Sequence, residues 1–385
     1  ERPPHSMASE SGVVPPEGGE VTVSAECECP EGVLELDGSF GEGGGQVLRN
    51  STSLAAILHR NIRICNVRFK RPKPGLRPQH LTGVRAAIEI SRAVAVGAKE
   101  NSMELEFFPQ EIVAQDLTFD IRTAGACTLI TQILLPIMLF ADKEMTATII
   151  GGTNVDFSPP VEYIDQVICQ RVLPLFGVHG QLNTLSRGYF PRGGGRIELH
   201  TAPLERGACL TPVDLVSKGE IVSVRGLVHV VDLPKNIAER MYQAAWKKIR
   251  RYFRRATVDI QISTERGPSK GTGIFLMAES DTGALYAWNE MGKIGTPAEQ
   301  VGENCVEGLA TQVDGLGCVD EHLQDQLIIF MMLAEGTSRI RVSEITEHTE
   351  TSLHFCKLVS KGDYSIEEDG PSKIITVQGI GKQRE

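Results

Sequence analysis

The chain has 385 residues, of which 41% are hydrophobic and 23% charged, and this balance excludes wholesale disorder. Its 39 glycines occur in short clusters without a three-residue period, which excludes a collagen-like protein and implies many tight turns. The net charge of −10 argues against a protein that coats nucleic acid with its whole surface.

The first half of the chain alternates between strands, loops rich in glycine or proline, and helices. Residues 1–32 are polar and rich in proline and glycine, and we expect them to form a flexible tail. The elements expected next are a strand over 33–36, a glycine loop over 37–46, a helix over 47–58, a strand over 62–69, a rigid proline loop over 71–78 and a helix over 80–96. They are followed by a strand over 103–108, a turn over 123–126, a helix over 127–140, a strand and turn over 149–154, a helix over 161–175 and a second glycine loop over 188–196.

The second half begins with a change of character between residues 213 and 310, where we expect an inserted smaller domain. Its elements are strands over 221–231, 256–262 and 274–277 around a basic helix over 235–255. The main pattern resumes with a helix over 320–330, a strand over 339–342, a helix over 349–359 and a strand over 373–377. We therefore predict an α+β fold (an α/β sandwich), with a large domain over 33–212 and 311–380 and a short C-terminal tail over 381–385.

A membrane-spanning protein and a cysteine-based zinc site are not favoured. The longest apolar stretch, residues 128–141, is too short to span a bilayer and contains Gln132 and Pro136, so we expect no membrane partner. Nine cysteines without a repeating spacing indicate reduced thiols in the cytosol or nucleus. Cys27 and Cys29 form an isolated CxC pair with no second pair nearby to complete a zinc site.

One segment, residues 59–88, contains basic residues but no Asp or Glu. In an acidic chain this distribution predicts a local anion site. Arg68, Arg71 and Arg77 flank the proline loop, and guanidinium groups bind phosphate through paired hydrogen bonds. Gln79 and His80 follow directly as neutral donors. A second basic cluster lies in the helix over 235–255 and is either a solvated face or another binding surface; it contains Lys247, Lys248, Arg250, Arg251, Arg254 and Arg255.

The first glycine loop matches neither common phosphate-binding pattern. Gln46 stands where a dinucleotide-binding fold needs a third glycine, and no P-loop motif occurs in the chain. Two interpretations stay open: a simple tight turn, or a loop that lets the backbone approach an anion while Glu42 holds a metal ion.

His348 is placed between a predicted strand and the start of a predicted helix. The positive end of a helix disfavours the imidazolium form, so the ring is expected to be neutral and nucleophilic at pH 7. The alternative is an ordinary polar residue at a helix start. His354, further along the same helix, is expected to have a packing or surface role.

Taken together, these motifs resemble those of the RNA 3′-terminal phosphate cyclase family. The segments that carry the resemblance are DGSFGEGGGQVLR (37–49), RPKPGLRPQHLTG (71–83), TAGACTL (123–129), GGTNVDFSPPVEY (151–163), RGYFPRGGG (187–195), DEHLQDQLIIF (320–330) and HTETSLH (348–354). The similarity covers about 33–380. It implies repeated units of a four-stranded sheet backed by two helices, like the C-terminal domain of translation initiation factor 3, with one smaller inserted α/β domain.

The family resemblance also implies a reaction and a set of site residues. Its members use ATP and a divalent metal, Mg²⁺ or Mn²⁺, and a histidine becomes adenylated before AMP passes to an RNA 3′-phosphate, which then closes to a 2′,3′-cyclic phosphate. By position the nucleophile is His348 and the metal-linked acid is Glu42. The adenylate pocket corresponds to Gln132, Pro159, His322, Asp325 and Gln326. The group that faces the RNA terminal phosphate corresponds to Arg49, Arg68, Arg71, Gln79 and His80.

The implied partner is RNA with a 3′-phosphate end, with no preference for DNA, because the 2′-hydroxyl reacts. The implied location is the nucleus (nucleoplasm), with the cytoplasm as a second location, and protein partners stay open. One departure from the family is His322, where close relatives carry Tyr beside the adenine. The rival function is that of the cyclase-like ribosome-biogenesis factors, which lack the histidine that His348 supplies here. A weaker alternative is an enolpyruvyl-transferase-like enzyme.

Overall fold

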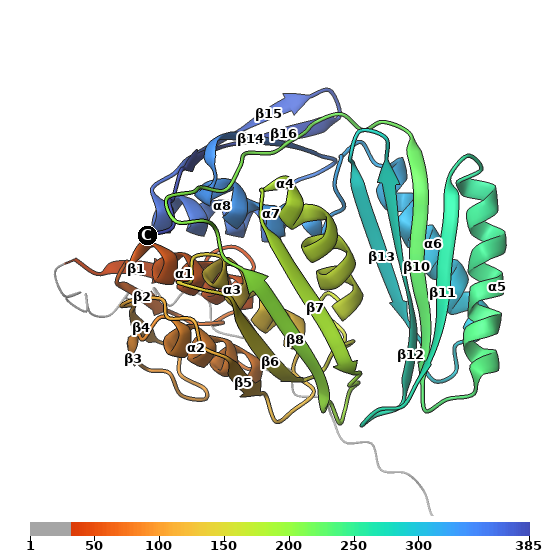
Figure 1. Cartoon of the computed structure of the whole chain (residues 1–385), viewed down its shortest axis with the longest axis horizontal. Helices are drawn as coiled ribbons and strands as arrows, with labels where there is room; N and C mark the ends of the chain where they lie inside the picture. The colour runs from red at the N-terminus through yellow and green to blue at the C-terminus, as the bar shows by residue number, and fades with distance from the viewer. Residues whose placement is uncertain (1–31) are drawn as a thin grey trace, which may run out of the picture. The chain divides into compact units, whose positions relative to one another are not determined.

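The computed structural model describes residues 32–385, in which helices alternate with the strands of several sheets (Figure 1). The predicted α+β class is confirmed, and the predicted tail over 1–32 and the Cys27–Cys29 pair lie almost entirely outside the described residues. No helix in the described part of the chain has the length and apolar character to cross a bilayer. The described residues contain four sheets of four strands each.

Three of the four sheets share one connectivity, strand–helix–strand–helix–strand–strand. In each, the first two strands are parallel and the last two are antiparallel neighbours. The first unit contains β1 (Leu34–Asp37), α1 (Gly45–Leu58), β2 (Ile62–Cys65), α2 (Pro78–Ile90), β3 (Val94–Val96) and β4 (Leu105–Phe108). The second contains β5 (Leu117–Asp120), α3 (Cys127–Met138), β6 (Met145–Gly151), η1 (Tyr163–Val172), α4 (Leu173–Leu175), β7 (His179–Ser186) and β8 (Gly195–Ala202). The third contains β9 (Asp214–Leu215), α7 (Leu323–Leu333), β14 (Glu335–Val342), α8 (Glu347–Ser360), β15 (Asp363–Asp369) and β16 (Ser372–Ile380).

The fourth sheet has a different connectivity and interrupts the third unit between β9 and α7. It contains β10 (Ile221–Val231), α5 (Lys235–Tyr252), β11 (Thr257–Glu265), β12 (Gly271–Ser280), β13 (Leu285–Met291) and α6 (Ala298–Asp314). Its strand order is β11-β10-β12-β13, so the first strand lies inside the sheet and not at its edge. The predicted boundaries 213 and 310 remain an interpretation of the sequence.

The helices of the three repeated units pack against one another between the outer sheets (Figure 1). Helices α3 and α7 are apolar on nearly every side, and almost all their residues are buried. A helix that is apolar all round belongs in the interior of a protein, so these two helices form the centre of the core.

Several predicted elements differ from the observed ones in their limits. The helix predicted over 235–255 ends at Tyr252, and the strand predicted over 339–342 begins at Glu335. The strand predicted over 62–69 ends at Cys65, because Asn66 and Arg68 adopt the left-handed backbone conformation at φ 53° and 55°. The helix predicted over 80–96 ends at Ile90, and after Arg92, at φ 47°, the chain forms the edge strand β3. The helix predicted over 320–330 begins at Leu323 and continues to Leu333. Strands β5, β7, β8, β9, β13 and β15 and helix α6 were not predicted.

The last residues of the chain pack on the second unit rather than extend away from it. The backbone of Arg384 exchanges hydrogen bonds with Gly207 and Ala208, at 2.8 and 3.1 Å between nitrogen and oxygen. The backbone nitrogen of Lys382 donates to the carbonyl of Leu333 at 3.0 Å. The segment predicted as a C-terminal tail is therefore tied to the fold.

A buried polar network joins the second repeated unit to the inserted sheet. Arg187 forms ion pairs with Glu162 at the start of η1 and with Glu265 on β11, where the Nε–Oε2 distance is 3.0 Å. Asn154 donates to Glu162 at 2.9 Å. Burial alone would raise the pKa of Glu162, but Arg187 and His229 outweigh it and hold that pKa below its usual value. Arg187 thus fixes the loop that leads into η1.

We predict that Arg187→Ala destabilises the protein by about 3–5 kcal/mol, because it leaves Glu162 charged and buried without its partner. The free energy of unfolding is measured by urea titration at pH 7. Since the pKa of Glu162 is depressed in the fold, the difference should persist at every pH above the pKa of an unfolded carboxyl group and shrink as the pH falls below that value. Arg192→Ala is the matched control, an exposed arginine on the same loop. Equal stabilities for the two variants would contradict the prediction.

Candidate functional site

A cleft of about 770 Å³ lies where the three repeated units meet. All twelve residues that the sequence analysis proposed for the site line this cleft: Glu42, Arg49, Arg68, Arg71, Gln79, His80, Gln132, Pro159, His322, Asp325, Gln326 and His348. Arg77, the third arginine of the proline loop, does not line it and instead pairs with Asn101 and Glu100. The structure brings the proposed residues together, while their roles stay predictions.

The repeated connectivity explains why these residues meet. The first helix of each unit contributes residues from its first two turns, namely Gln46 and Arg49 on α1, Leu129 and Gln132 on α3, and Asp325 and Gln326 on α7. The second helix contributes residues at its start, namely Gln79 and His80 on α2, Tyr163 on η1 and His348 on α8. Helix N-termini carry unpaired N–H groups and a partial positive charge, so their convergence favours an anionic ligand.

His348 lies in the first turn of α8, directly after a well-capped helix start. The hydroxyl of Thr346 accepts a hydrogen bond from the backbone nitrogen of Thr349 at 3.1 Å. This cap fixes the first turn of α8 and therefore the position of the imidazole above the cleft.

A chain of hydrogen bonds sets the tautomer of His348. Gln46 donates from Nε2 to Oδ2 of Asp325 at 2.6 Å, so its Oε1 must accept the bond from Nδ1 of His348 at 2.7 Å. Nδ1 therefore carries the proton of the neutral ring. Nε2, which makes no hydrogen bond to residues 32–385, retains its lone pair.

The charge states of His348 and Asp325, the two ends of this hydrogen-bond chain, follow from their surroundings. Burial lowers the pKa of His348, and Arg49 and Arg71 lower it further, while Asp325 acts against them. Burial raises the pKa of Asp325 to about 6, although His348 and Arg49 oppose the shift. At pH 7 the imidazole is therefore neutral and the carboxyl group is ionised.

Glu42 lies on the glycine loop beside His348. It forms an ion pair with Arg71, and its Oε2 is 2.8 Å from Nδ1 of His348 without forming a hydrogen bond. The glycines make this approach possible. At Gly41, where φ is +59°, an added Cβ would lie 2.3 Å from Oγ1 of Thr351. The loop is thus both a tight turn and a close packing contact.

The basic side of the cleft is held in place by the backbone of the proline loop. Arg68 donates from Nη1 to the carbonyls of Lys73 at 2.8 Å and Gly75 at 3.0 Å. Burial lowers the pKa of His80 to about 3, and the neighbouring arginines contribute, so this ring is neutral. The side-chain oxygen of Gln79 accepts a bond from the backbone of Ala126 at 3.1 Å, which leaves its amide protons for a ligand.

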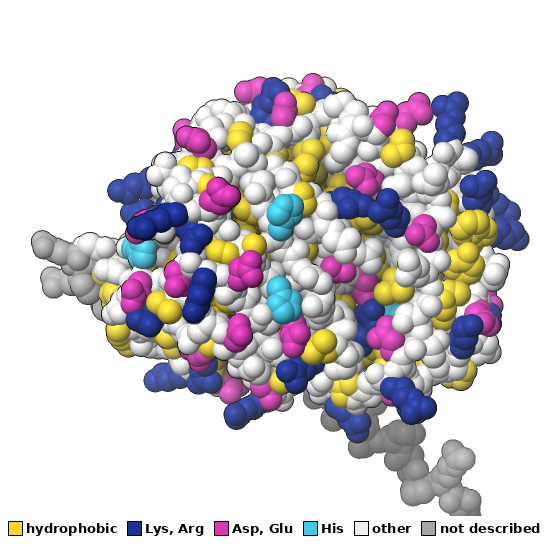
Figure 2. Space-filling view, viewed as in Figure 1, with side chains coloured by type: hydrophobic (Ala, Val, Ile, Leu, Met, Phe, Trp, Pro, Cys, Tyr) yellow, Lys and Arg dark blue, Asp and Glu magenta, His cyan; other side chains and the backbone are white. Residues whose placement is uncertain are grey.

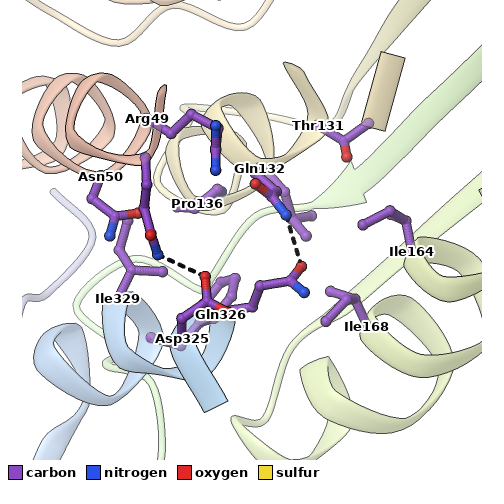
Figure 3. Close-up of a pocket in the computed structure, with 13 residues that line it drawn as sticks. Arg49, Asn50, Thr131, Gln132, Pro136, Ile164, Ile168, Asp325, Gln326 and Ile329 are labelled. Carbon is purple, nitrogen blue, oxygen red and sulfur yellow. Dashed lines mark hydrogen bonds between the residues drawn. The ribbon is translucent and has the colours of Figure 1, made fainter. Parts of the chain in front are cut away.

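The opposite end of the cleft contains the amides and a stacked imidazole. Gln132 donates to Gln326 at 3.0 Å, a bond that crosses from α3 to α7 over a small adjoining pocket (Figure 3). Gln326 in turn donates to the carbonyl of His322 at 2.8 Å. The ring of His322 stacks on Trp288, with 5.7 Å between ring centroids. A flat ligand thus meets an aromatic pair and neutral amides here.

Sequence reasoning missed several residues of the cleft: Gly45, Gln46, Pro72, Leu129, Phe157, Ser158, Tyr163 and Asn289. Gln46 lies within the first glycine motif, but nothing in a single sequence showed that it joins His348 to Asp325. Asn289 lies on β13, a strand that was not predicted.

The basic cluster of α5 lies away from the cleft. Figure 2 shows Lys and Arg side chains gathered at the edge of the molecule where α5 lies in Figure 1. Lys248 and Arg255 form ion pairs with Glu307 and Glu220, and every basic residue of the cluster except Lys248 is exposed. Arg254 and Arg255 follow the end of α5 at Tyr252. A binding role for this helix stays a prediction.

Comparison with known proteins gives one consistent result. A family model described as RNA 3′-terminal phosphate cyclase matches residues 40–366. An RNA 3′-terminal phosphate cyclase of Pyrobaculum neutrophilum is 37% identical over 348 residues, covering 90% of this chain and 99% of the relative. One of Staphylothermus marinus is 38% identical, covering 91% and 99%. A probable RNA 3′-terminal phosphate cyclase of Dictyostelium discoideum is 34% identical, covering 90% and 83%.

We predict that ¹⁵N NMR at pH 7 shows His348 neutral with its proton on Nδ1, and that the ring titrates below pH 6.5. In Gln46→Met the acceptor is lost, so this preference for the Nδ1 proton should weaken. His354, on the same helix but stacked on Phe40, is the internal control and should not change. A proton on Nε2 of His348 in the unchanged protein would contradict the hydrogen-bond chain.

Proposed function

We propose that this chain, which belongs to the RNA 3′-terminal phosphate cyclase family, converts an RNA 3′-phosphate end to a 2′,3′-cyclic phosphodiester with ATP as the energy source. The proposal includes a covalent adenylyl intermediate on His348. The observation that carries it is the hydrogen-bond chain from Asp325 through Gln46, which leaves Nε2 of a neutral His348 available as a nucleophile.

The first step is an exchange of bonds at the α-phosphorus of ATP. Nε2 of His348 supplies the electron pair for a new P–N bond, the bond from phosphorus to the bridging oxygen breaks, and pyrophosphate leaves. Nδ1 keeps its proton, and the oxygens of Gln46 and Glu42 near it stabilise the positive charge that develops on the ring.

The cleft has the size and charge that this nucleotide requires. A volume of about 770 Å³ falls in the usual range for small-molecule sites. Arg49 and Arg71 supply positive charge, and Gln132, Gln326 and His322 supply neutral donors and a stacking face. Burial lowers the pKa of Arg49 to about 10, so it stays charged at pH 7.

The side chains of the cleft could hold a divalent metal only if the bound nucleotide supplied further ligands. Residues 32–385 contain no cluster of three or more metal-binding side chains. Glu42 offers a buried oxygen, Oε2, that accepts no hydrogen bond. Mg²⁺ or Mn²⁺ would bind this carboxylate and take its other ligands from phosphate oxygens and water, where it would neutralise phosphate charge.

Two further bond exchanges complete the reaction. An oxygen of the RNA 3′-phosphate attacks the adenylyl phosphorus, the P–N bond breaks, and His348 is regenerated. The neighbouring 2′-hydroxyl then attacks the 3′-phosphorus and AMP leaves. The side of the cleft that would hold this terminal phosphate contains Arg49, Arg68, Arg71, Gln79 and His80. DNA lacks the reacting hydroxyl, so the chemistry selects RNA without reading its bases.

The cellular setting is a separate proposal. We place the activity in the nucleus, with the cytoplasm as the alternative, but the chemistry does not depend on a nucleus because relatives of this chain occur in archaea. A role limited to binding in ribosome assembly is not favoured, since that role would not require a neutral histidine oriented by a buried carboxylate.

We predict that incubation with ATP labelled at the α-phosphate leaves an acid-labile label on the protein. The label should be absent in His348→Ala, which lacks the nucleophile, and present in His354→Ala, a histidine on the same helix outside the cleft. Gel electrophoresis and mass spectrometry detect the added AMP. A label that persists in His348→Ala would overturn the assignment.

We predict that an RNA ending in a 3′-phosphate is cyclised and that the same RNA ending in a 3′-hydroxyl is not, because only the former supplies the oxygen that receives AMP. Resistance of the product to phosphatase identifies the cyclic end. A DNA strand with a 3′-phosphate serves as the control and should not be cyclised. Equal consumption of the 3′-phosphate and 3′-hydroxyl RNAs would refute the proposed RNA step.

A further inference from the structure

The mouth of the cleft carries an aromatic side chain that the proposed chemistry does not use. Phe157, in the loop between β6 and η1, lines the cleft, yet its side chain is 102% exposed. Its φ of +62° lies in the left-handed region, where a bulky residue is rare. The ring of Phe157 is exposed to water, so packing does not explain why its backbone adopts an unfavourable conformation. Strained backbone conformations of this kind are concentrated at ligand-binding and active sites.

A second loop, from the inserted sheet, lies beside the loop of Phe157. Nζ of Lys293 is 3.6 Å from Oδ1 of Asp156, which ties the β13–α6 loop to the β6–η1 loop. Ile294, next to Lys293, is 108% exposed. We call Asp156, Phe157, Lys293 and Ile294 the cleft rim. The rim therefore combines two exposed apolar side chains with a solvent-exposed ion pair between their loops.

We propose that Phe157 is a stacking platform for a nucleobase at the 3′ end of the RNA substrate. The proposal rests on the proposed function, because it takes the RNA end as the ligand. Bases of a single-stranded end are free to stack on aromatic rings, and every base offers such a face. The platform thus adds affinity without selecting a sequence, in keeping with a reaction that recognises an end.

The exposure of Phe157 favours RNA over ATP as its ligand. A small molecule is usually 70–90% buried in its pocket, so the residues that hold it are enclosed by their neighbours. The exposed ring of Phe157 at the mouth of the cleft is instead suited to a ligand that extends out of the cleft into solvent. The RNA chain must do this, because its terminal phosphate lies inside and the rest of the polymer outside.

The test compares Phe157→Ala and Phe157→Trp with the unchanged enzyme, and Phe190→Ala serves as a control. Phe190 is also exposed, at 80%, but does not line the cleft. We expect Phe157→Ala to raise the KM for 3′-phosphate RNA about tenfold with little change in kcat. Trp should restore the KM, Phe190→Ala should not alter it, and AMP loading from ATP should be normal in all variants.

A second arm replaces the last or the penultimate nucleotide of the RNA with an abasic one. In the unchanged enzyme one of these RNAs should show a similar rise in KM, whereas Phe157→Ala should not respond to the loss of that base. An equal response in both enzymes would overturn the platform. A raised KM for ATP during AMP loading by Phe157→Ala would also overturn it, since the ring would then hold the adenine.

The two proposals fail in different ways. If Phe157→Ala loads AMP and cyclises RNA with an unchanged KM, the platform is wrong and the proposed function stands. If the unchanged protein neither loads AMP nor cyclises RNA, the proposed function is wrong and the platform falls with it.

Discussion

The convergence of helix N-termini is the constraint on which the site depends. In each repeated unit both helices follow a parallel strand and therefore start at the same edge of the sheet. When three such units pack helix against helix, their starts meet around one cleft. Unpaired N–H groups and the aligned peptide dipoles make that cleft favourable for phosphate before any side chain is considered. The arginines of the cleft add positive charge to the positive electrostatic potential that the helix N-termini already provide.

The same packing lets a buried carboxylate control a distant imidazole. Asp325 on α7, Gln46 on α1 and His348 on α8 belong to two units far apart in the sequence, and a hydrogen-bond chain joins them. Asp325 and Arg49 are both partly buried in the wall of the cleft, and this burial shifts the pKa of each toward its neutral form. Buried groups with shifted pKa values and no role in the core are typical of functional sites. The fold therefore tolerates a local loss of stability where its chemistry requires one.

The sequence predicted the residues of the cleft better than the elements that hold them. Glu42, Arg71 and His348 lie in motifs whose order matches a known family. Matching motifs identify equivalent site residues even when the three-dimensional structure is not known. Element limits depend instead on single backbone conformations, such as the left-handed turn at Asn66, which a hydrophobic pattern does not reveal. The role of Gln46 was also invisible, because its partners come from helices about 280 and 300 positions away along the chain.

The place of the fourth sheet in the chain explains why it lines one wall of the cleft. The fourth sheet enters the third unit between β9 and α7, so its last elements lead directly into the helix that carries Asp325. This connection places Asn289 on the cleft and Trp288 under the ring of His322. It also brings Lys293 to Asp156 at the rim. The repeated units therefore supply the charged side chains and the proposed nucleophile, and the fourth sheet supplies Trp288, on which the ring of His322 stacks.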